Sequence, residues 1–235
     1  MKWMKQAAKY LATAGLAACL LLACAAPASA ASLQTPVWMQ AWADTRTGSV
    51  IGQLEKDQFT AEIKVDGMNG VVYLVRSNGK MYWKASKLDG TEVLCLLVRD
   101  GSAYQLDHTR QLAIRLGDES AAYSMIGISE QAVEQSLSTG KATGFTSKKK
   151  TVNGLTYDAE VFDMQLDGKP VEMTYCYDNN GVLRYLITNV NGKQASMEYR
   201  KVSDKVDESL LKIPAGYTVC SKAEADALND VYDEE

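Results

Sequence analysis

Residues 78–101 read NGKMYWKASKLDGTEVLCLLVRDG, and three turn-forming dipeptides divide this stretch at even intervals. Asn78-Gly79, Asp89-Gly90 and Asp100-Gly101 follow one another at a spacing of eleven residues. Asn-Gly and Asp-Gly favour the positive φ angles of tight hairpin turns. The stretch therefore predicts short antiparallel strands joined by hairpins.

The same pattern extends outward in both directions. Asp66-Gly67 precedes the quoted stretch, and after a gap the spacing resumes at Asn153-Gly154, Asp167-Gly168, Asn180-Gly181 and Asn191-Gly192. Between these turns apolar and polar residues alternate, which places one side of each strand on a core. The pattern predicts about eleven strands, near 58–66, 70–77, 80–88, 91–99, 102–107, 110–117, 143–152, 155–166, 169–178, 182–190 and 193–202.

Helices are expected where this pattern is interrupted. Residues 118–127 and 129–140 are typical of two short helices that form an insertion, 118–140, between the two sets of strands. Residues 31–57 are expected to form an N-terminal helical segment. Residues 219–235 form an acidic tail, of which the part from Ser221 onward is expected to be a solvated helix.

These elements predict a mainly β (α+β) fold. About eleven twisted antiparallel strands tend to curl, so we expect a curved sheet that forms a half-open barrel with short helices across its concave face. No internal repeat accompanies the regular turns, which argues against a propeller. A curled sheet with helices across its mouth encloses an apolar cleft, the usual setting for a hydrophobic ligand.

Two short motifs add a resemblance to a known family. The stretch LLVRDGSAYQLDHTRQLAIRL (96–116) and the stretch LLKIPAGY (210–217) resemble segments of the LolA/LolB-like fold, the half-open barrel of bacterial lipoprotein carriers. The resemblance covers roughly residues 35–218, and residues 58–218 are expected to form the LolA-like β domain. It implies a cleft for acyl chains or lipidated proteins.

The first 30 residues are typical of an export signal, with three lysines followed by an uncharged run and small residues. Two cleavage points remain open. Cleavage after Ala30 would remove a secretory signal peptide, 1–30. A lipoprotein signal, 1–23, would instead leave Cys24 as a lipidated first residue. The chain is therefore expected in the periplasm or on the extracytoplasmic side of the envelope, either free or anchored through Cys24.

The charge excludes some partners. The 235-residue chain has a net charge of −4, and loss of the three signal lysines leaves −7. This mildly acidic composition, without a basic stripe, argues against binding to nucleic acid. The remaining partners are a lipid or lipidated-protein ligand and an envelope protein.

Little in the sequence suggests catalysis. His108 is the single histidine and follows a predicted strand, so a plain turn position is expected. Motifs of the common hydrolase and nucleotide-binding classes are missing from the sequence, so we expect a non-enzymatic protein without a cofactor or a metal. Cys95, Cys176 and Cys220 lie among apolar neighbours, which favours buried thiols, with one disulfide plus a spare thiol as the alternative.

The resulting hypothesis is an exported envelope protein that binds a lipid, an acyl chain or a lipidated protein in an apolar cleft. The alternative is a structural or protein-interaction module whose core is filled. Candidate cleft and lid residues are the aromatic, methionine and aliphatic side chains Trp38, Trp42, Trp83, Tyr123, Met125, Ile126, Val133, Leu137 and Tyr175.

Overall fold

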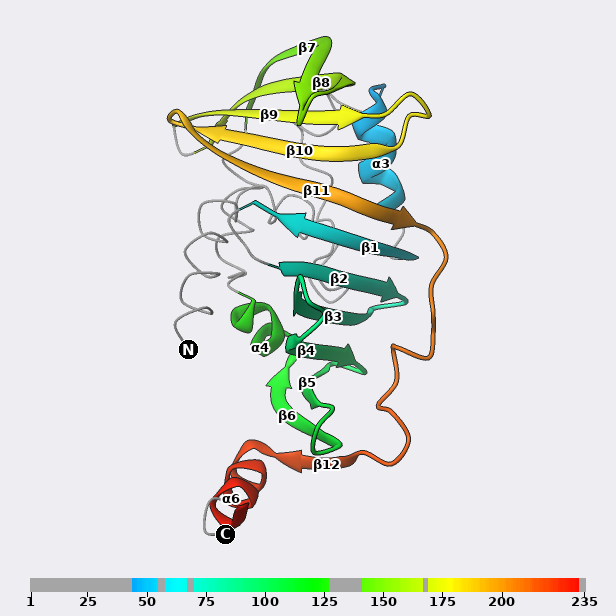
Figure 1. Ribbon diagram of the computed structural model, residues 1–235, viewed down its shortest axis with the longest axis vertical. Helices are drawn as coiled ribbons and strands as arrows, with labels where there is room; N and C mark the ends of the chain where they lie inside the picture. Colours follow the sequence, from blue (N-terminus) through cyan, green and yellow to red (C-terminus); the bar gives the residue numbers. More distant parts are fainter. Residues whose placement is uncertain (1–43, 55–57, 67–69, 127–140, 167–168, 233–235) are drawn as a thin grey trace.

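The structure is a computed structural model that describes residues 44–54, 58–66, 70–126, 141–166 and 169–232. Twelve strands form one sheet (Figure 1). The first six are β1 (Gln58–Val65), β2 (Gly70–Ser77), β3 (Lys80–Lys87), β4 (Glu92–Arg99), β5 (Ser102–Asp107) and β6 (Leu112–Asp118). The other six are β7 (Lys141–Val152), β8 (Leu155–Leu166), β9 (Lys169–Tyr177), β10 (Leu183–Val190), β11 (Lys193–Ser203) and β12 (Thr218–Ser221).

The sheet consists of two meanders joined side by side. Its strand order is β12-β6-β5-β4-β3-β2-β1-β11-β10-β9-β8-β7, so β1 pairs with β11, where the two meanders meet. All neighbours are antiparallel except β12, which runs parallel to β6. The sheet is curved and does not close, because β12 and β7 lie at its two ends. The predicted mainly β, half-open architecture is confirmed.

The hairpins form where the sequence predicts them. In the pairs Asn78-Gly79, Asp100-Gly101, Asn153-Gly154 and Asn191-Gly192, both residues have positive φ angles, between 50° and 79°. Two consecutive positive φ angles define the type I′ turn, whose twist matches that of the flanking strands. This turn chemistry sets the register, which determines the face of the sheet on which each side chain lies.

Three helices accompany the sheet in the described part of the chain. They are α3 (Arg46–Leu54), α4 (Glu119–Met125) and α6 (Lys222–Tyr232). α4 lies within the predicted helix 118–127, and α6 forms most of the tail that was expected to be helical. The predicted helix 129–140 lies outside the described residues. None of the described helices is long and apolar enough to cross a membrane.

β12 was not expected from the sequence, and it has a clear structural role. After β11 the chain crosses the sheet as the segment 204–217, which we call the crossing segment, and then forms β12 beside β6 (Figure 1). Ala225 of α6 is buried against this edge with three other residues, Leu112, Ile114 and Cys220. The C-terminal helix is therefore anchored to the sheet at this point.

Each face of the sheet has its own core. The helix face, on which the side chains of α4 pack, has the largest cluster and includes Trp83, Leu96, Phe162, Tyr175 and Met197. The opposite face has two smaller clusters. One of them lies under the crossing segment and contains Val75, Tyr82, Cys95, Leu97, Leu106, Ala113 and Leu211. The other contains Tyr157, Ala159, Cys176 and Ile187.

Candidate functional site

The helix face carries apolar side chains in rows that cross several strands. Ala61, Leu74, Trp83 and Leu96 are paired in succession across β1, β2, β3 and β4. All four are buried, and each belongs to the same cluster. Directly opposed side chains in neighbouring strands contact one another, so the row is a continuous apolar strip.

A second row continues this strip into the other meander. Val65, Met197, Leu186 and Tyr175 are paired in succession across β1, β11, β10 and β9. All four are buried in the same cluster as the first row. One apolar surface therefore runs from the first meander to the second without interruption at the β1–β11 junction.

Methionine is prominent on this surface. Met81, Met164, Met173 and Met197 are all buried there. Methionine has an unbranched, polarizable side chain that adapts to irregular shapes and is common on surfaces that bind varied apolar partners. The helix face therefore has the composition of an adaptable apolar surface.

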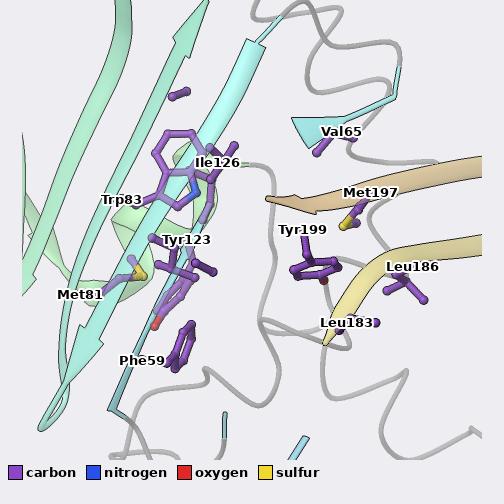
Figure 2. Packing of buried hydrophobic residues seen from close by; sticks show 14 of the residues in the cluster. Phe59, Val65, Met81, Trp83, Tyr123, Ile126, Leu183, Leu186, Met197 and Tyr199 are labelled. Carbon is purple, nitrogen blue, oxygen red and sulfur yellow. The ribbon is translucent and has the colours of Figure 1, made fainter. Parts of the chain in front are cut away.

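α4 packs on one end of this surface. Asp118 caps the helix by accepting hydrogen bonds from the backbone N–H and the hydroxyl of Ser120. Tyr123 and Ile126 are buried in the cluster, and they lie close to Trp83 and Met81 of β3, as seen in Figure 2. Side chains of β10 and β11, among them Leu186, Met197 and Tyr199, form a second group in the same view.

α3 is held at the other end by a polar network. Glu160 of β8 accepts hydrogen bonds from the backbone N–H groups of Arg46 and Thr47, at 3.0 and 2.7 Å, and from the Thr47 hydroxyl at 2.6 Å. The same hydroxyl lies 2.7 Å from the hydroxyl of Tyr177, and the Arg46 guanidinium lies over the Tyr177 ring. Burial raises the pKa of Tyr177 above its usual range. Thr45 caps α3 locally, since its hydroxyl accepts from Gly48 N–H at 3.0 Å, and Glu160 adds acceptors for the first two N–H groups from a distant strand.

The face of the sheet on which Glu160 lies is not evident from the alternation of side chains in β8. In the structure Glu160 pairs with Tyr175 and lies on the helix face. The pattern was ambiguous because both faces of β8 carry buried apolar side chains.

The structure brings together four of the residues that the sequence singled out as cleft or lid candidates. Trp83, Tyr123, Ile126 and Tyr175 are buried in the helix-face cluster. Met125 is 42% exposed and is not part of that cluster. The other candidates, namely Trp38, Trp42, Val133, Leu137 and the lipidation candidate Cys24, lie outside the described residues.

A second group of polar side chains lies on the opposite face, and the sequence did not indicate it. His108 occupies the predicted turn, between β5 and β6, but its side chain contacts Glu92 of β4 and Tyr217 of the crossing segment. Cys95 lies beside them and is buried. In the described part of the chain the three cysteines are free and buried, as the sequence favoured.

The sheet is single, open and mainly antiparallel, with helices packed on its apolar face. This is the architecture that the sequence predicts. No protein-family model matches the chain. No curated protein matches it either.

Solved structures with a similar overall arrangement include three from bacteria. The lipoprotein LppX of Mycobacterium tuberculosis has a TM-score of 0.41 at 12% identity, with 69% of this chain and 95% of LppX covered. An uncharacterized conserved protein from Thermus thermophilus also has a TM-score of 0.41, at 8% identity, with 75% and 99% covered. A LolA superfamily protein from Nitrosomonas europaea has a TM-score of 0.28 at 10% identity, with 67% and 91% covered. These values are too low to transfer a function.

Proposed function

We propose that this protein is an exported, non-catalytic envelope protein that binds a lipid, an acyl chain or a lipidated protein on the helix face. The observation that carries the proposal is the uninterrupted apolar surface across both meanders, with its four methionines. The export signal in the first 30 residues supports a location outside the cytoplasm, with cleavage after Ala30 or lipidation at Cys24.

Burial of an acyl chain on such a surface provides enough free energy for binding. Each buried CH₂ group contributes about 0.8 kcal/mol, so about fifteen of them contribute about 12 kcal/mol, of which about 8 kcal/mol remain after an association cost of about 4 kcal/mol. A net gain of about 8 kcal/mol corresponds to a dissociation constant of about 1 μM. The ligand therefore needs no charged anchor, and α4, through Tyr123 and Ile126, is the part of the described chain that would act as its lid.

The described helices are short compared with the surface that they contact. At about 1.5 Å per residue, the nine residues of α3 span about 14 Å and the seven of α4 about 10 Å. Twelve strands at about 4.8 Å spacing make a sheet about 50 Å wide. A small displacement of α4 would therefore open a site for an apolar chain next to side chains such as Trp83.

One observation favours a second candidate function. The same helix-face side chains are buried, with Leu96, Phe162 and Leu186 fully enclosed. A filled core of this kind suits a structural or protein-interaction module that holds no ligand. The two candidates make opposite predictions about the environment of Trp83.

The deciding experiment uses Trp83 as a reporter. The exported chain contains three tryptophans, and the double substitution Trp38→Phe, Trp42→Phe leaves Trp83 alone. Titration with a fatty acid brominated along its chain should quench this fluorescence to saturation at a fixed stoichiometry. Native mass spectrometry should show the added mass of the same ligand.

Two variants provide the matched control. Ile126→Asp places a charge on the buried end of α4, whereas Leu155→Asp makes the same kind of change at a residue that is 63% exposed. Ile126→Asp should weaken quenching while circular dichroism shows a folded protein, and Leu155→Asp should leave it unchanged. Unquenched Trp83 together with no added mass would refute the ligand-binding proposal and support the structural module.

A further inference from the structure

The opposite face carries a cluster of side chains that the proposed ligand surface does not use. Glu92 and Cys95 come from β4, His108 from the β5–β6 turn and Tyr217 from the end of the crossing segment. Three parts of the chain that are up to 125 residues apart in sequence thus meet at one place.

A β-bulge brings the two β4 side chains to the same side of the sheet. Residues three apart on a regular strand point to opposite faces. Here Ala85 pairs with Leu94 while Ser86 pairs with Glu92, so Val93 is an extra residue in β4. The bulge reverses the alternation at this point, and such bulges often redirect a side chain next to a functional site.

The geometry of the three groups suits a small cation. Glu92, Cys95 and His108 each offer one ligand atom, and these three atoms lie within 4.8 Å of one another. Within this group, His108 Nε2 is 3.4 Å from Glu92 Oε2. Tetrahedral zinc, with bonds of about 2.0–2.3 Å, needs its ligand atoms about 3.3–3.6 Å apart. The nitrogen–oxygen pair has this separation already. Glu92 and His108 are partly exposed, so small rotations can bring their ligand atoms closer to Cys95 Sγ.

The hydrogen bonds around the cluster also suit metal binding. Nδ1 of His108 forms a hydrogen bond with the Tyr217 hydroxyl, so a proton on Nδ1 leaves Nε2 free to bind the metal. Tyr82 of β3 is buried in the same cluster as Cys95. The backbone near Tyr217 is fixed to the same turn, since Thr218 N–H donates to the Gln111 carbonyl at 2.9 Å.

The chemistry of the donors selects the metal. One sulfur, one imidazole nitrogen and one carboxylate oxygen form a mixed set that zinc accepts, whereas magnesium and calcium prefer oxygen ligands. A thiolate and a carboxylate together neutralise a divalent cation. Zinc binds the thiolate form of cysteine, so binding releases the thiol proton of Cys95 to water.

We propose that Glu92, Cys95 and His108 form a Zn²⁺ site in which water is the fourth ligand. Tyr217 orients the histidine from outside the site. Zinc bound there ties β4, the β5–β6 turn and, through Tyr217, the crossing segment together. This proposal does not depend on the function proposed above, because the two surfaces lie on opposite faces of the sheet.

The test uses the purified protein with Zn²⁺ alone, under reducing conditions, in isothermal titration calorimetry. One Zn²⁺ should bind per chain. Co²⁺ in its place should produce a sulfur-to-cobalt absorption band in the near ultraviolet, which reports the Cys95 bond directly. Cys95→Ala should abolish this band, and Cys176→Ala, which removes another buried thiol, should keep it.

Two further variants test whether zinc binding requires His108 and whether Tyr217, which forms a hydrogen bond with that histidine, strengthens binding. His108→Gln changes a side chain that is 38% exposed, so the protein should stay folded while zinc binding is lost. Tyr217→Phe should weaken binding by about 10–100-fold, the usual effect of removing an outer hydrogen-bond partner. Absence of stoichiometric binding, or equal binding by folded His108→Gln and the unaltered protein, would overturn the proposal.

Discussion

The attachment of α3 to the sheet depends on Glu160, and its removal has a calculable effect on stability. Glu160→Ala removes three hydrogen bonds to the start of α3, two of them to backbone N–H groups. Loss of an N-terminal cap costs about 1–2 kcal/mol, and loss of a negative charge near a helix N-terminus costs about 0.3–1 kcal/mol more. We therefore expect the free energy of unfolding to fall by about 1.5–3 kcal/mol.

A graded series separates the hydrogen bonds from the charge. Glu160→Gln keeps one carbonyl oxygen as an acceptor but loses the charge, so its loss of stability should lie between those of Glu160→Ala and the unaltered protein. In a chain of this size each kcal/mol lowers Tm by about 2–4 °C, which gives about 3–12 °C for the alanine variant. Urea denaturation followed by circular dichroism gives the corresponding free energies.

Two controls test whether the effect passes through α3. Glu172→Ala removes a carboxylate from the neighbouring strand β9 and should change stability much less. In a Thr47→Ala background, Glu160→Ala should cost less than it does alone, because the bond to the Thr47 hydroxyl is already missing. If Glu160→Ala unfolds at the same urea concentration as the unaltered protein, the Glu160 hydrogen bonds do not stabilise α3.

Three further predictions concern packing, acid and thiols. Leu97→Ala, at a fully buried position beneath the crossing segment, should lower the free energy of unfolding by about 2–5 kcal/mol, while Leu155→Ala at an exposed position should have little effect in the same urea assay. Hydrogen bonds from Ser120 lower the pKa of Asp118, so the stability that this carboxylate contributes is present above its unfolded pKa and is lost as pH falls through the lower folded pKa. In urea denaturation from about pH 6 to about pH 2, Asp118→Asn should therefore lose less stability on acidification than the unaltered protein. Equal losses in the two proteins would contradict this role. Thiols enclosed in the core should react slowly with Ellman's reagent until denaturant is added, and fast reaction in the native protein would contradict their burial. The thiols concerned are Cys95, Cys176 and Cys220.

Most of the sheet could be predicted because local signals determine it. A dipeptide such as Asn153-Gly154 has a backbone preference that suits one type of turn, and alternation on either side then sets the strands. β12 escaped prediction because its four residues have no alternation of their own and pair with β6 across about a hundred residues. A pairing at that distance leaves no periodic pattern in the sequence.

The candidate sites were harder to predict for a related reason. Assigning a side chain to a face relies on strict alternation, and the extra residue Val93 breaks it between Glu92 and Cys95. Nothing in the spacing of these residues reveals that His108 meets them. The burial of Trp83 and Tyr175 was easier to predict, because bulky apolar side chains on a strand are usually part of the core.

The junction between β1 and β11 has a consequence for the order in which the chain can fold. Thr60 pairs with Ser203, 143 positions later, whereas the other antiparallel neighbours within each meander are joined by short turns. During synthesis the first meander is complete long before β11 exists, so β1 waits as an unpaired edge of eight residues. An exposed edge strand can pair with a strand of another molecule. The interval between the emergence of β1 and the arrival of β11 is therefore when a newly made chain is most at risk of aggregation, and when binding of a chaperone to this edge would have the greatest effect.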